Sequence, residues 1–144
     1  MAVLIVLFGS LLVYRLLGAF GIGAFATWQD SARFALATMF GFTAISHFAP
    51  MRRDLIAMVP PSLPRPDVIV FFTGILELDG AVGLLFEATR TWAAWGLIML
   101  LVAMFPANVS AARRGVLLRG KPPTPLWIRT PMQLLFIGWA WWVR

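Results

Sequence analysis

The sequence predicts an all-α fold, a bundle of transmembrane helices, from three observations. Of its 144 residues, 60% are hydrophobic and only 12% are charged, whereas soluble domains carry roughly 25% charged residues. The mean hydropathy is +0.84. The apolar residues also fall into five runs of about 19 to 24 residues, each long enough to cross a hydrocarbon layer of about 30 Å. We therefore expect residues 1–144 to form a single membrane domain.

The first two runs begin differently. Residues 2–25 lack the basic start and the small-residue cleavage site of a signal peptide, so we expect a spanning helix that is retained. The second run covers residues 31–49, with a helix cap at Asp30 and Ser31 and a stop at Pro50.

Prolines mark the later runs, which cover residues 68–86, 91–112 and 125–143. Asp67 is the expected cap of the third run, and Thr124 is the expected cap of the fifth, with Pro125 at its first helical position. Pro106 and Pro131 lie inside the last two runs, where each removes a backbone hydrogen bond. Such irregular backbone at membrane depth normally lines a cavity.

The loop over residues 50–67 contains a different kind of helix. Its first part, residues 51–59, combines charged and apolar side chains and predicts a short helix at the membrane surface, either an anchor or a lid over a cavity. Basic residues concentrate in this loop and after the fourth run, namely Arg52, Arg53, Arg65, Arg113, Arg114, Arg119 and Lys121. Since Lys and Arg are retained on the cytoplasmic side, we expect a cytoplasmic N-terminus.

The composition excludes several classes of site. The chain has no cysteine and one histidine, which excludes disulfides, thiolate chemistry and a multi-histidine metal site within one chain. The net charge of +6 could suit nucleic acid, but the basic residues lie between apolar runs, where anionic lipid and topology explain them. We expect neither a metal nor a nucleic-acid partner.

Glu77 is the most informative candidate residue. It lies near the middle of the third run, where an ionised carboxylate costs roughly 2.5 to 3.5 kcal/mol. Thr73 is one turn earlier on the same helix face, whereas Asp79 lies about 200° around the helix. The two carboxylates should therefore have different partners. Arg15 of the first run is the expected intramembrane counter-ion of one of them.

Four more polar side chains are predicted to gather with Glu77 in the cytoplasmic half of the bundle, namely His47, Asn108, Arg129 and Gln133. Together with Thr73 and Asp79, they are the candidate residues of a ligand site or a proton relay, the default for ionisable groups in a membrane. Structural alternatives remain open. Glu77 could form a buried pair with an arginine, and His47 could be a solvated or capping residue. Asn108 and Gln133 could hydrogen bond between helices.

Five stretches match a known family in order and spacing: residues 41–48 (GFTAISHF), 58–64 (MVPPSLP), 73–78 (TGILEL), 105–109 (FPANV) and 129–133 (RTPMQ). On these motifs the chain resembles the DoxX-like family of small bacterial membrane proteins. The resemblance implies a four-helix bundle in the bacterial inner membrane, with residues 2–25 as an additional N-terminal helix. It also implies a redox process, because one branch resembles small subunits of thiosulfate:quinone oxidoreductase and others are associated with oxidative stress.

The leading functional hypothesis is a bundle that binds a small hydrophobic ligand such as a quinone. Its polar head would face His47, Glu77, Asn108 and Gln133. Arg129 would stabilise negative charge, and electrons would come from a redox partner protein, because nothing in the chain suits flavin, haem or an iron–sulfur cluster. Two alternatives are a small proton-coupled transporter, working as a homodimer, and a non-catalytic subunit of a membrane oxidoreductase complex.

Overall fold

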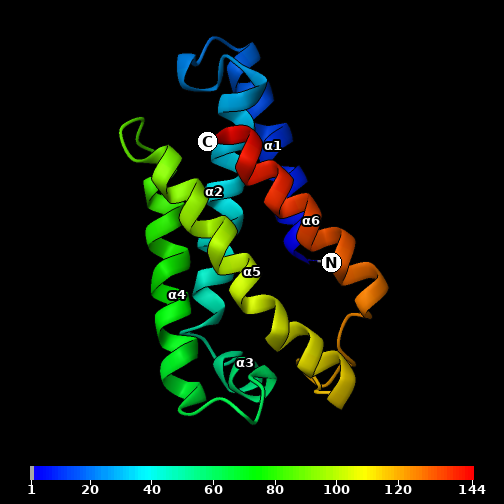
Figure 1. The fold of residues 1–144 in the computed structure, drawn as a ribbon. Coiled ribbons are helices and arrows are strands. Elements are labelled where there is room, and N and C mark those ends of the chain that lie inside the picture. The colour runs from blue at the N-terminus through cyan, green and yellow to red at the C-terminus, as the bar shows by residue number, and fades with distance from the viewer. Residues whose placement is uncertain (1) are drawn as a thin grey trace.

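The computed structural model describes residues 2–144, and helices are the only extended secondary structure over them (Figure 1), which confirms the all-α class. Five long helices and one short helix follow one another, with a 3-10 turn after the first. In chain order they are α1 (Ala2–Ala19), η1 (Gly23–Phe25), α2 (Trp28–Ser46), α3 (Arg52–Met58), α4 (Pro66–Gly83), α5 (Arg90–Arg114) and α6 (Leu126–Val143).

The five long helices form a bundle in which neighbours run in alternating directions, and α2 is its central helix. Helix α2 packs against α1, α4 and α6, while α5 closes the bundle by contacting α4 and α6. Two hydrogen bonds show the alternating directions. At the start of α2, Gln29 Nε2 donates to the carbonyl oxygen of Trp142 near the end of α6, at 2.8 Å. At the other end of α2, His47 lies against Val70 near the start of α4.

The predicted single helix over residues 2–25 is wrong, because α1 ends at Ala19. The chain then turns at Gly21, whose φ of +95° suits glycine. A Cβ on Gly18 would collide with the carbonyl oxygen of Phe25, so the absence of a side chain at Gly18 lets η1 fold back onto the end of α1. Apolar composition alone did not reveal this turn.

Helix caps also differ from the expected ones. Helix α2 starts three residues early, because the Thr27 side chain accepts a hydrogen bond from the Asp30 backbone amide at 3.0 Å. Helix α4 starts at Pro66, and Arg65 precedes it with a left-handed φ of 50°. The cap of α6 is Pro125 instead of Thr124. The prolines inside α5 and α6 are confirmed.

The predicted short helix before the prolines is confirmed as α3, and hydrogen bonds hold it to the end of α5 and to the loop that follows α5. The Arg114 Nη2 atom donates to three carbonyl oxygens at the end of α3, those of Ala57, Met58 and Val59, at 2.8, 3.0 and 3.1 Å. The Asp54 carboxylate accepts from the Arg119 backbone amide at 2.9 Å. Helix α3 is therefore fixed across the end of the bundle.

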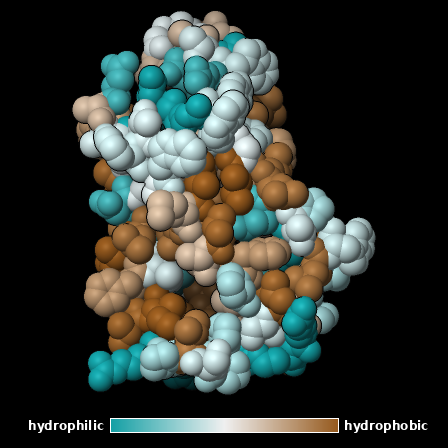
Figure 2. Space-filling model, viewed as in Figure 1, coloured by the Kyte–Doolittle hydropathy of each residue, from teal (hydrophilic) through white to brown (hydrophobic). Residues whose placement is uncertain are grey.

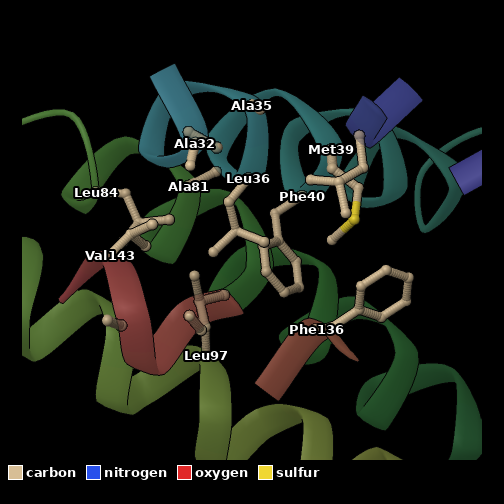
Figure 3. Close-up of a cluster of buried hydrophobic side chains, with 14 residues drawn as sticks. Ala32, Ala35, Leu36, Met39, Phe40, Ala81, Leu84, Leu97, Phe136 and Val143 are labelled. Atoms are coloured by element: carbon tan, nitrogen blue, oxygen red, sulfur yellow. The ribbon is translucent and has the colours of Figure 1, made fainter. Parts of the chain in front are cut away.

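The core is small and lies where α2 meets its neighbours (Figure 3). Alanines at positions 32 and 35 of α2 allow close helix approach, and Leu36, Met39 and Phe40 fill the space toward Leu97 and Phe136. Large apolar side chains elsewhere point outward, as with Met99, which is 71% exposed. Figure 2 shows hydrophobic surface across the middle of one face, with hydrophilic residues gathered mainly at its ends. Helices α1 and α5 are long and apolar enough to cross a membrane.

Candidate functional site

A buried polar cluster lies where the C-terminal end of α2 meets α4. Helix α2 ends at Ser46, and the next residue, His47, turns its ring toward α4. Thr73 and Glu77, one helical turn apart on α4, meet this ring from the other side. The structure thus brings these three of the predicted site residues together.

The imidazole ring of His47 has a partner at each nitrogen. Nδ1 lies 2.8 Å from the carbonyl oxygen of Val70 and 3.3 Å from the hydroxyl of Thr73. Nε2 lies 3.6 Å from the Oε2 atom of Glu77. His47 is 3% exposed and Glu77 is 6% exposed, so the pair is shielded from solvent.

These contacts define the proton content of the pair. A carbonyl oxygen only accepts hydrogen bonds, so the hydrogen of a neutral His47 ring resides on Nδ1 and Nε2 is left with a lone pair. A lone pair facing a carboxylate is repulsive unless a proton lies between them. The pair is thus electrically neutral when it holds one proton between Nε2 and Oε2, either as imidazolium with carboxylate or as imidazole with carboxylic acid.

The surroundings of the Glu77 carboxylate are consistent with a proton between Nε2 and Oε2. Its buried Oε2 atom has no hydrogen-bond partner within 3.5 Å in the described chain, and the His47 ring is its nearest charged neighbour. An unpaired buried carboxylate is costly. The group positioned to donate to this oxygen is Nε2 of a protonated His47 ring, at 3.6 Å.

Gly74 makes the cluster possible. A Cβ at this position would lie 2.5 Å from the Cβ of His47 and 2.9 Å from its Cγ, distances that real Cβ atoms essentially never show. The missing side chain allows the His47 ring to enter between Thr73 and Glu77. This contact joins two helices that are distant in sequence, so the sequence alone does not reveal it.

Arg15 is not the counter-ion of Glu77 or Asp79, which corrects the sequence-based expectation. Its Nη1 atom donates to the carbonyl oxygens of Phe25 and Ala26, at 3.1 Å each. Its guanidinium also lies over the Trp28 ring, 4.7 Å from the centroid. The turn after Ala19 supplies these partners, and a straight helix over residues 2–25 would not.

The other predicted site residues lie apart from this cluster. The Gln133 amide donates to the Leu101 carbonyl oxygen at 2.6 Å and so links α6 to α5 near Pro106. This is the interhelical role that the sequence left as an alternative. Asn108 and Arg129 are both half-buried, and the hydrogen bonds and ion pairs of residues 2–144 join neither of them to the cluster.

Two cavities lie outside the cluster. The larger, about 730 Å³, runs between α4 and α5 and includes Asp79. The smaller, about 420 Å³, follows the second half of α5 from Phe105 to Arg114. Neither is lined by His47 or Glu77. Within residues 2–144, no three His, Asp or Glu side chains gather as metal ligands.

Comparison with known families adds one finding. A family model with the description "Domain of unknown function (DUF8561)" matches residues 36–144. No curated protein and no solved structure matches the chain. The matched region begins within α2 and contains the whole buried cluster, whereas α1 and η1 precede it.

Proposed function

The chain belongs to the DUF8561 family, and we propose that it is an integral membrane protein that binds and releases a proton at the His47–Glu77 pair while it transports a small hydrophobic molecule. One observation carries this proposal. A histidine and a glutamate face each other at 3.6 Å, both are nearly inaccessible to solvent, and the pair is neutral only with one proton.

The distribution of apolar residues supports the membrane location. Large hydrophobic side chains lie exposed on the outer faces of the long helices, where lipid would cover them. Basic residues of the loops around α3 and after α5 lie at the opposite end of the bundle from the α4–α5 turn. We place that basic end in the cytoplasm of a bacterial cell, with a cytoplasmic N-terminus.

The internal arrangement supports proton-coupled transport. The proline in α5 and the proline in α6 interrupt two helices of the bundle, and helices interrupted in this way can change their packing as a substrate passes. The His47–Glu77 pair joins α2 to α4, so loss of its proton leaves a buried charge at the interface of these two helices. The resulting repulsion and desolvation cost would favour a different helix packing.

Quinone-linked redox is a second proposal, supported by the position of two family-like motifs. The stretches 41–48 and 73–78, on which the chain resembles the DoxX-like family, pack against each other and contribute the members of the proton pair. In that role the pair would supply a proton, and a partner protein would supply electrons. The polar groups expected to hold a quinone head do not share one cavity, since Gln133 is bonded to Leu101. This arrangement favours transport over quinone binding.

The chain has a single histidine, which makes the proton pair directly observable. Protein labelled with ¹⁵N in lipid nanodiscs should give one set of imidazole signals, with Nδ1 protonated throughout a pH titration and Nε2 changing. In Glu77→Gln, the Nε2 signal should follow a different pH dependence. Glu87→Gln, an exposed carboxylate in the α4–α5 turn, is the matched control and should titrate as wild type.

Two results would contradict the proposal. One is a His47 ring that carries its neutral hydrogen on Nε2. The other is a titration that is identical in wild type and Glu77→Gln. Either result would show that the pair does not share a proton, and the site would then be a structural contact.

A further inference from the structure

The groove between α4 and α5 is a second site that the proton pair does not use. Its volume of about 730 Å³ lies within the usual range of small-molecule pockets. Glycines at positions 80, 83 and 96 contribute no side chains to its floor, and most of the remaining lining is apolar. The groove lies on the outer face of the hairpin formed by α4 and α5.

Asp79 is the one charged residue in the lining of this groove. It is exposed, and no Arg, Lys or His nitrogen of residues 2–144 lies within 4.0 Å of its carboxylate. Glu77, two residues earlier, points to the other side of α4 and pairs with His47. The carboxylate of Asp79 therefore presents a negative charge in apolar surroundings without a cation from its own chain.

Aromatic rings border the same groove near the α4–α5 turn. Phe86 is 60% exposed and Trp92 is 80% exposed, so the faces of both rings are accessible. Faces of aromatic rings attract cations, and tryptophan does so most strongly. A carboxylate, two free rings and an apolar floor together suit a molecule that carries a positive charge within an apolar body.

We propose that the groove between α4 and α5 binds a lipophilic monocation, such as an ammonium or phosphonium with apolar substituents, through the carboxylate of Asp79. An anion would be repelled by this carboxylate, and a neutral lipid chain would leave it unpaired. A second copy of the chain related by twofold symmetry would bring two Asp79 carboxylates into one interface. Charge complementarity therefore favours the monocation. This inference does not depend on the proton pair.

Two ions of the same shape and opposite charge test the proposal. Tetraphenylphosphonium should bind the purified protein in detergent, measured by calorimetry, and tetraphenylborate should bind at least about tenfold more weakly. Asp79→Asn should weaken phosphonium binding by at least about tenfold and abolish the preference between the two ions. Glu87→Gln, which removes a carboxylate outside the lining, should bind as wild type.

A second variant tests the groove itself. A Cβ at Gly96 meets no atom within 4 Å, so Gly96→Leu should fold and fill the groove, and phosphonium binding should fall. Unchanged binding in Asp79→Asn, or equal binding of the two ions, would overturn the proposal. A third result would also overturn it: the protein is a stable dimer that does not bind phosphonium, and Gly96→Leu dissociates this dimer. A second copy of the chain would then occupy the groove. Glu77→Gln should bind phosphonium as wild type in detergent, which separates this site from the proton pair.

Discussion

At the scale of single residues, the candidate site depends on a close approach between two helices. Gly74 leaves room for the His47 ring, and the ring separates Glu77 from the Val70 carbonyl. The His47 ring has one orientation that places a polar partner near each of its nitrogen atoms. Small substitutions in this cluster should therefore change the stability of the protein by amounts that differ from one position to the next.

Gly74→Ala should destabilise the protein by about 1 to 3 kcal/mol, because its Cβ would lie 2.5 Å from the Cβ of His47 and the two helices would have to separate. Thermal unfolding in detergent measures the effect. Gly41→Ala on α2 is the control, since a Cβ there meets nothing within 4 Å. An unchanged unfolding temperature in Gly74→Ala would show that the two helices do not pack closely at this point.

The two members of the proton pair should respond unequally to mutation. Glu77→Gln should cost about 1 kcal/mol or less, because an amide N–H can donate to Nε2 of a neutral imidazole. His47→Leu should cost about 3 kcal/mol, because it leaves Glu77 buried without a partner. Unfolding in detergent at neutral pH compares them. Equal losses would indicate that Glu77 has another partner in solution.

At the scale of helices, one side chain of α5 makes three of the hydrogen bonds that hold α3. Arg114 reaches across from the end of α5 and satisfies three carbonyl oxygens that the last turn of α3 leaves free. Asp54 adds a second link through the Arg119 amide. These bonds couple the position of α3 to that of the part of α5 after Pro106.

Arg114→Gln should release α3, because the shorter amide cannot reach these carbonyl oxygens. Amide hydrogen exchange of residues 52–58 should accelerate at least about tenfold, which corresponds to about 1.4 kcal/mol of local stability. The neighbouring Arg113→Gln should leave exchange in α3 unchanged. Equal acceleration in both variants would indicate a general effect of charge at this end of the bundle.

The helices themselves could be predicted from the sequence more fully than their ends. Long apolar runs predict helices, but the prolines give the ends only roughly: α2 ends at Ser46 instead of residue 49, and α4 begins at Pro66 instead of residue 68. The end of α1 was missed because Gly18 acts through a contact with Phe25 that forms only when the chain folds back, and because the turn at Gly21 lies inside an uninterrupted apolar run. The sequence placed Glu77 and His47 in one polar cluster, but depth along straight helices also placed Asn108, Arg129 and Gln133 there, because it does not include the direction in which each side chain points.

At the scale of the whole molecule, charge separates the two ends of the bundle. One end carries α3 and the basic loops, and the other carries η1, the α4–α5 turn and the C-terminal residue. Between the two ends, the buried proton pair lies on one side of α4, against α2, and the groove lies on the other side, against α5. For the proposed membrane location, this arrangement predicts that the basic end faces the cytoplasm.

The absence of cysteine allows that orientation to be measured with single substitutions. Lys121→Cys at the basic end and Ala88→Cys in the α4–α5 turn are both at exposed positions. In intact cells, a membrane-impermeant maleimide should label Ala88→Cys, and it should label Lys121→Cys only after permeabilisation. The reverse pattern would place the basic end outside, and labelling of both in intact cells would contradict a membrane-spanning bundle.

The proton pair has an electrical consequence as well. In the membrane location and role proposed above, a proton that reaches His47 and Glu77 from one side would cross part of the transmembrane field, because Glu77 lies partway along α4. Moving one elementary charge across the full field changes its energy by about 2.3 kcal/mol per 100 mV. Occupancy of the pair would therefore depend on membrane voltage as well as on pH, and an energised cell and a depolarised one would hold it in different average states.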